Sequence, residues 1–214
     1  MAKKALILIQ GISSGNGYLR VRYNDAKLQT QYDTVKNINT EQFFEMKSNW
    51  LLNSLGRLGD SLNDVWVYYR NTQARKLICK EVRNHIKELQ DAGYTVDILA
   101  HSLGTVIALC SGPNKLKNLI NVNRLILMGS PLGIGNPIAR AFTNYHTERY
   151  SNNFTCNYID YLWSSEDFVS KKLIGRTIDL LQSVCKTDMK VHHTSTKHDV
   201  KQYLEFIKEN NILE

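Results

Sequence analysis

Short apolar runs alternate with amphipathic segments along most of the 214-residue chain. The apolar runs are mostly continuous rather than alternating, which is typical of strands that are covered on both faces. Strands that alternate with helices predict a doubly wound α/β fold, with a mostly parallel sheet and helices on both of its faces. The candidate strands are Lys4–Gln10, Val65–Arg70, Thr95–Ala100, Arg124–Met128, Asn157–Trp163 and a shorter run near Met189–His192.

The clearest helix lies between the second and third candidate strands, where apolar residues recur at spacings of three and four over residues 74–89. Asn71 or Thr72 can cap its start, and Gly93 suits the left-handed position just after its end. Two more helices are predicted, at Thr40–Leu55 and from Val200 to Ile207.

Two segments, Ile12–Asn39 and Leu132–Asn153, have no clear period and are expected to be irregular. Both follow the ends of strands, the edge at which ligands bind in open α/β sheets, and the second segment could form a small lid over that edge. The length of the chain fits one domain over residues 1–214.

Composition excludes several classes of protein. No apolar run approaches the ~20 residues of a membrane span, and the apolar start at Ala5–Ile9 is too short for a signal peptide. Four widely spaced cysteines without a CxxC pair favour buried reduced thiols and a cytoplasmic protein. The formal charge of +7 comes from scattered basic residues, so no nucleic-acid partner is expected, while contact with a membrane surface stays open.

The segment with the clearest chemistry is Ala100-His101-Ser102-Leu103-Gly104, which directly follows a candidate strand and precedes a short apolar helix. A nucleophilic serine on a sharp turn between strand and helix needs small residues two positions before and two positions after it. Ala100 and Gly104 meet that need. The alternative is a serine that only caps a buried helix.

This segment resembles the G-x-S-x-G nucleophile elbow of the α/β-hydrolases, with alanine in place of the first glycine. The resemblance runs from Leu6 to the last helix and implies a minimal lipase- or esterase-like core that begins near the family's third strand. Gly129-Ser130-Pro131-Leu132 resembles the G-S-P-L stretch of lipase-like members and is expected to line the active-site cleft. In this family an acid and then a histidine follow the serine along the chain.

The resemblance implies an acid just after the strand Asn157–Trp163. The loop there resembles the family's acid loop and offers Asp167, with Glu166 as the alternative, whereas Asp160 lies within the strand.

The base is expected in the last loop before the final helix. His193-Thr194-Ser195 resembles the terminal H-x-S segment of lipase-like members and favours His193. His192 is predicted to complete the short strand, and His198 to be an exposed residue in the first turn of the last helix. Three neighbouring histidines could instead bind a metal, but no H-E-x-x-H spacing occurs, and no metal is expected.

Acyl transfer also depends on two backbone N–H groups aimed at the developing oxyanion. The resemblance assigns one to Leu103 and the other to Ile12, or else to Gly11, in a segment similar to the family's H-G segment with Gln10 in place of histidine. The glycines after Gln10 do not have the spacing of a dinucleotide fingerprint, and no G-K-[ST] of a P-loop occurs, so no cofactor is expected.

The resemblance therefore implies a serine hydrolase that cleaves a carboxylic ester, lipid ester or thioester through an acyl-serine intermediate. Its catalytic residues would be Ser102, Asp167 and His193, and its partner a small-molecule or lipid acyl substrate. Two alternatives stay open: a lipase or acyltransferase that works at membrane surfaces, and a non-catalytic binding protein that retains the fold.

Overall fold

Six strands form one all-parallel sheet in the order β2-β1-β3-β4-β5-β6. The computed structural model describes residues 3–11, 18–28, 31–43, 68–112, 119–134, 137–151, 153–167, 169–195 and 197–213. The strands are β1 (Lys3–Ile9), β2 (Thr34–Ile38), β3 (Tyr94–His101), β4 (Ile120–Met128), β5 (Phe154–Ser164) and β6 (Cys185–Thr194). Because all six strands run the same way, their carboxyl ends meet at a single edge of the sheet.

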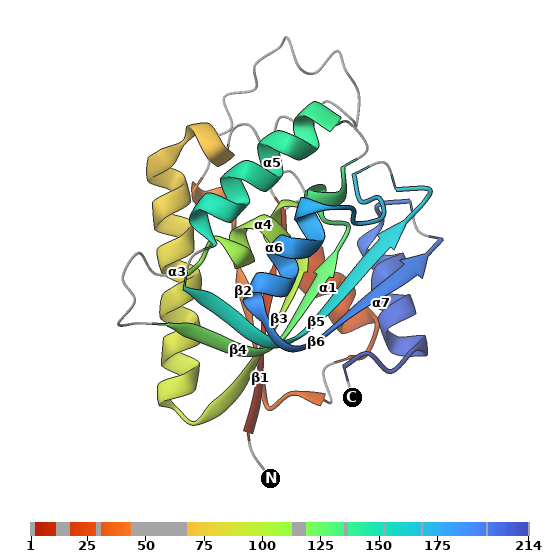
Figure 1. Ribbon diagram of the computed structural model, residues 1–214. Helices are drawn as coiled ribbons and strands as arrows, with labels where there is room; N and C mark the ends of the chain where they lie inside the picture. Colours follow the sequence, from red (N-terminus) through yellow and green to blue (C-terminus); the bar gives the residue numbers. More distant parts are fainter. Residues whose placement is uncertain are drawn as a thin grey trace.

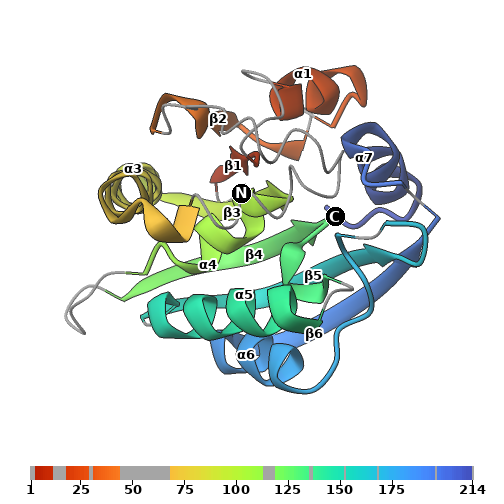
Figure 2. The same ribbon diagram turned by 90° about the horizontal axis from the view of Figure 1, so that it is seen from above.

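Helices cover both faces of the sheet (Figures 1 and 2). Figure 2 shows α1 and α7 on one face, and α3, α4, α5 and α6 on the other, so the predicted doubly wound arrangement is confirmed. Helix α5 packs against α4, α6 and the 3-10 turn η5. The helices and 3-10 turns are α1 (Tyr18–Asp25), η2 (Glu41–Phe43), α3 (Thr72–Asp91), α4 (Leu103–Leu109), η5 (Pro131–Gly133), α5 (Pro137–Tyr150), α6 (Arg176–Val184) and α7 (Val200–Glu209).

The apolar run of β1 supplies two separate cores. Ala5, Ile7 and Ile9 belong to the cluster under α3 and α4, whereas Leu6 and Leu8 belong to the cluster under α1 and α7. All five side chains have no exposed surface. Successive side chains of a strand point to opposite faces, so a strand between two helical layers must be apolar at every position. This is the physical reason for the continuous apolar runs in the sequence.

Helix α3 begins and ends where the sequence predicts. The side chain of Asn71 accepts a hydrogen bond from the backbone N–H of Ala74, and Gly93 has a φ of +82° just after the last turn. That φ favours glycine because a residue with a Cβ atom would bring it too close to its own backbone carbonyl.

Three predictions of secondary structure are wrong. The segment Ile12–Asn39, expected to be irregular, contains helix α1 and strand β2. The sequence signal for β2 is weak because this edge strand is only partly buried and carries polar residues. Residues 68–70 of the predicted strand Val65–Arg70 are helical, and residues 65–67 lie outside the described residues. The segment Leu132–Asn153 contains η5 and the regular helix α5. Of the predicted helix Thr40–Leu55, residues 44–55 lie outside the described part.

No helix in the described part of the chain is both long and apolar enough to cross a membrane.

Candidate active site

Ser102 lies on a strained turn at the carboxyl end of β3. Its backbone has φ +54° and ψ −130°, a conformation that costs a residue with a side chain on the order of 1–3 kcal/mol. Hydrogen bonds hold it there: the Ser102 N–H donates to the Met128 carbonyl (2.9 Å), and its own carbonyl accepts from the N–H (3.0 Å) and the hydroxyl (2.7 Å) of Thr105. The turn therefore presents the Ser102 side chain at the edge of the sheet.

The small residues around Ser102 let α4 lie directly against β1. A Cβ atom on Gly104 would come within 2.2 Å of the Ile9 carbonyl oxygen, which no rearrangement of side chains could relieve. Ala100 is fully buried in the same core. The spacing that the sequence predicts for a nucleophile elbow thus has a packing reason at Gly104.

His198 joins Ser102 to Asp167. Its Nε2 atom is 3.2 Å from Ser102 Oγ, and its Nδ1 atom is 2.8 Å from Asp167 Oδ2. Since a carboxylate only accepts hydrogen bonds, Nδ1–H donates to Asp167, which leaves Nε2 to accept from the serine hydroxyl. The side chain of Asp167 is fully buried, and that of His198 is 19% exposed.

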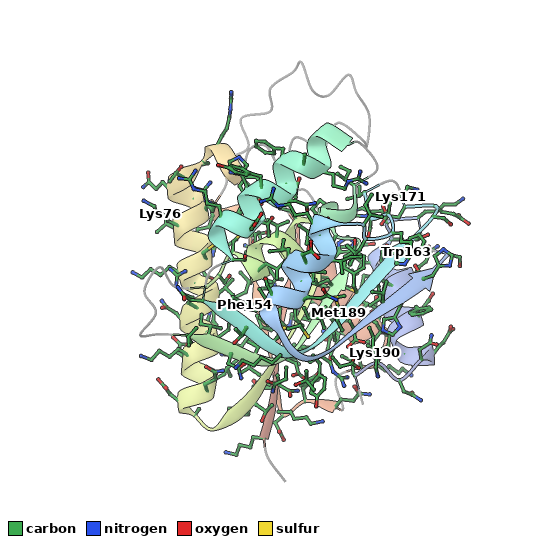
Figure 3. The ribbon with its side chains drawn as sticks, viewed as in Figure 1. Lys76, Phe154, Trp163, Lys171, Met189 and Lys190 are labelled. Atoms are coloured by element: carbon green, nitrogen blue, oxygen red, sulfur yellow. The ribbon has the colours of Figure 1, made fainter. Side chains whose placement is uncertain are left out.

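The structure corrects the predicted position of the histidine, since it does not bring His193 to Ser102 or Asp167. Strand β6 pairs with β5 as far as Thr194, so His193 lies within the strand, next to the ring of Trp163 (4.5 Å between centroids) and 3.4 Å from Ser165 Oγ. Figure 3 shows β5 running from Phe154 at its start to Trp163 near its end.

His198 precedes the last helix rather than lying in its first turn. Helix α7 begins at Val200, and the side chain of Asp199 caps it by accepting from the Lys201 N–H (2.9 Å). His198 has a φ of +57° and reaches back over the end of the sheet from this loop. The sequence carries a signal for this start of the helix, because an aspartate such as Asp199 directly before an amphipathic helix is a typical N-cap, which places His198 before the helix.

The three histidines near the C-terminus do not converge. His192 contacts Asp160 (2.8 Å), His193 contacts Ser165, and His198 contacts Asp167 and Ser102. Within the described ranges, no cluster of three His, Cys, Asp or Glu side chains could hold a metal ion.

Asp167, not the alternative Glu166, is the carboxylate at the site. Its Oδ1 atom accepts from the backbone N–H groups of Val169 (2.8 Å) and Ser170 (3.2 Å). Its Oδ2 atom accepts from His198 and from the hydroxyl of Tyr203 (2.8 Å). Four donors fix the orientation of this buried carboxylate, whereas Glu166 is exposed.

Comparison with known proteins shows which solved structures are similar in fold. No protein-family model and no curated protein matches the sequence. Among solved structures, the chain is similar to one from work on LipS and LipT, two metagenome-derived lipolytic enzymes, at 8% identity with a TM-score of 0.59, covering 99% of this chain and 93% of that one. It is similar to the esterase Pf2001 of Pyrococcus furiosus at 12% identity with a TM-score of 0.54, over 98% of this chain and 81% of that one. The chain has the α/β-hydrolase fold.

A third similar structure is an uncharacterized protein from Bacillus cereus, at 17% identity with a TM-score of 0.52. The match covers 99% of this chain, which spans 60% of the length of that protein.

In this α/β-hydrolase fold, Gly11 lies against the serine. A Cβ atom on Gly11 would be 3.1 Å from Ser102 Cβ, 3.4 Å from Ser102 Oγ and 3.2 Å from the Leu103 nitrogen. The backbone after β1 therefore approaches the start of α4 closely, next to the Leu103 N–H that the sequence predicts as an oxyanion donor. Ile12, the predicted second donor, lies outside the described residues.

Gly129 and His101 both pack against the ring of His198. Gly129 has a φ of +59°, and a Cβ atom there would be 3.0 Å from both Cε1 and Nδ1 of His198. The ring of His101 lies 4.9 Å from that of His198, at a tilt of 39°. Burial, with a smaller contribution from His198, holds the pKa of His101 well below its usual value, so this ring is neutral.

Proposed function

We propose that this chain is a serine hydrolase of carboxylic esters, with Ser102 as nucleophile, His198 as base and Asp167 as acid. The proposal rests on one observation: the His198 ring lies within hydrogen-bond distance of both Ser102 Oγ (3.2 Å) and the Asp167 carboxylate (2.8 Å). A serine hydroxyl is a weak nucleophile until an oriented base takes its proton, and this arrangement supplies both the base and its orientation.

Each group then has a definite role in the reaction. His198 Nε2 takes the Ser102 proton as Oγ attacks the ester carbonyl, and Asp167 stabilises the imidazolium that forms. The Leu103 N–H donates to the oxyanion. His198 then gives the proton to the leaving alcohol, and a water molecule, activated by the same ring, releases the acid and frees Ser102.

The substrate class is inferred from the similar structures. Two of them are described as lipolytic enzymes or as an esterase, which favours a carboxylic ester over other acyl compounds. The fold alone does not choose among these substrates, so the chemical step is tested before the substrate.

Labelling with a fluorophosphonate probe tests the proposal directly, because the probe reacts only with an activated serine. We expect labelling of the wild type, loss of labelling in Ser102→Ala, and at least a hundredfold lower labelling rate in His198→Ala. His193→Ala is the matched control, since this exposed histidine lies on β6 without touching Ser102, and it should label like the wild type. A folded wild-type protein that takes up no label would refute the proposal and favour a binding protein with this fold.

If the wild type is labelled, p-nitrophenyl esters of increasing acyl length would then define the substrate. Hydrolysis that vanishes in Ser102→Ala is the expected result.

A further inference from the structure

The hydroxyl of Tyr203 shares its acceptor with the proposed base. Tyr203 lies on α7 with no exposed surface, and its hydroxyl donates to Asp167 Oδ2 at 2.8 Å. The same oxygen accepts from His198 Nδ1, also at 2.8 Å. The tyrosine therefore acts on the oxygen that faces the imidazole, whereas the two backbone donors act on Oδ1.

A second donor on that oxygen changes how strongly the carboxylate attracts a charged imidazole. Each hydrogen bond to a carboxylate draws off part of its negative charge. With the tyrosine in place, Asp167 still orients His198, but it stabilises the imidazolium less than it would if Oδ2 accepted a hydrogen bond from His198 alone. Burial strengthens this influence of the tyrosine on the charge of Asp167. Because Asp167 has no exposed surface, water could not replace the tyrosine hydroxyl as a donor if the hydroxyl were removed.

Two other titratable groups lie near His198, and neither places a negative charge on its ring. The ring of His101, at the end of β3, packs against it and is neutral, and the carboxylate of the next residue, Asp199, caps α7. Among the described residues, Asp167 is therefore the carboxylate that meets the His198 ring directly.

We propose that Tyr203 is a positioning residue that sets the basicity of His198 through Asp167, a role that takes its catalytic meaning from the proposed function. Its hydroxyl donates to Asp167, and its ring lies 6.1 Å from that of His101. Through this hydrogen bond, Tyr203 limits how strongly Asp167 attracts the imidazolium that forms when His198 accepts the Ser102 proton.

The chain contains a matched control for this contact. The hydroxyl of Tyr32 donates to Asp97 Oδ2 at 2.9 Å, and Tyr32 belongs to the same apolar cluster as Tyr203. The other partners of Asp97 are the Asn123 side chain and the Arg124 N–H, and it makes no contact with His198. Tyr32→Phe therefore removes a similar buried hydrogen bond without touching the site.

The test compares Tyr203→Phe with Tyr32→Phe by NMR titration of the histidine rings, with the His198 signal assigned from its absence in His198→Gln. We expect the titration midpoint of His198 to rise by roughly half a pH unit or more in Tyr203→Phe and to stay within about 0.1 unit of wild type in Tyr32→Phe. The acid limb of the fluorophosphonate labelling rate should move to higher pH by the same amount in Tyr203→Phe only. Both variants should lose similar stability, because each loses one buried hydrogen bond. If the role of Tyr203 were purely structural, the His198 midpoint would therefore stay unchanged in Tyr203→Phe, as it should in Tyr32→Phe.

Replacement of all tyrosines by 3-fluorotyrosine keeps the test decisive if Tyr203→Phe does not fold. The fluorinated phenol is a stronger donor, so the His198 midpoint should fall, opposite to the effect of Tyr203→Phe. An unchanged midpoint in folded Tyr203→Phe, or in the fluorinated protein, would overturn the proposal. Because the titration needs no activity, these results stay distinct from failure of the wild type to label, which would refute only the proposed hydrolase function.

Discussion

Substitution of Gly129 by alanine tests whether the space beside His198 matters for the activation of the serine. A Cβ atom at this position would lie 3.0 Å from two atoms of the His198 ring, where ordinary contacts begin at 3.4 Å. The ring would have to shift by a few tenths of an ångström, which would disturb a hydrogen bond to Ser102 that is already 3.2 Å long. We expect the rate of fluorophosphonate labelling to fall about tenfold or more, because reactivity is steeply sensitive to the placement of the base.

Gly175→Ala separates this effect from backbone strain. Gly175 also has a positive φ (+52°), but a Cβ atom there would meet nothing within 4 Å. Each substitution should cost about 1–2 kcal/mol of stability for the left-handed backbone, which lowers Tm by about 2–8 °C in a domain of this size. Only Gly129→Ala should slow labelling. Equal labelling rates in the two folded variants would refute the reasoning about the His198 ring.

Three further predictions concern the same edge of the sheet. Ser102→Gly should be more stable than Ser102→Ala by about 1 kcal/mol in urea unfolding, because glycine relieves the backbone strain at φ +54°; equal midpoints would contradict this strain. Gly11→Ala should slow fluorophosphonate labelling about tenfold with little change in Tm, because its Cβ would lie 3.2 Å from the Leu103 nitrogen; wild-type labelling would exclude that N–H as an oxyanion donor. Because burial lowers the pKa of His101 in the folded state, the unfolded chain binds a proton at this histidine first as pH falls below about 6.5. The free energy of unfolding should therefore drop there by up to about 1.4 kcal/mol per pH unit. His101→Leu should flatten this slope in urea unfolding measured from pH 7 to pH 5, and an unchanged slope would exclude His101 as its source.

The parts of the site that depend on neighbouring residues could be predicted from the sequence. The position of Ser102 follows from a strand, a tight turn and a helix within a few residues. Asp167 follows from the chain order of the family and from the strand before it. These signals are local, so they survive without knowledge of the tertiary structure.

The proposed base, His198, could not be placed in the same way, because the end of β6 is set by pairing with β5. Residues such as Val191 on this edge strand are half exposed, so the apolar pattern is weak and the strand appeared shorter than its ten residues. The sequence therefore predicts His193 in a loop, although it lies in the strand. The contact between Gly129 and the ring of His198 cannot be read from the sequence either, since the two positions are 69 residues apart.

The order of the strands has a consequence for how the protein folds. Ser102 and His198 are 96 residues apart in the chain, and β4, β5 and β6, which lie in that order beside β3 in the sheet, come between them in the sequence. Contacts of such long range form late, because the entropy of closing large loops must be overcome first. Labelling of Ser102 would therefore report the last stage of folding: in a refolding experiment, reactivity toward a fluorophosphonate should appear after helical circular dichroism has recovered. The time at which fluorophosphonate reactivity appears would then measure when the sheet is complete.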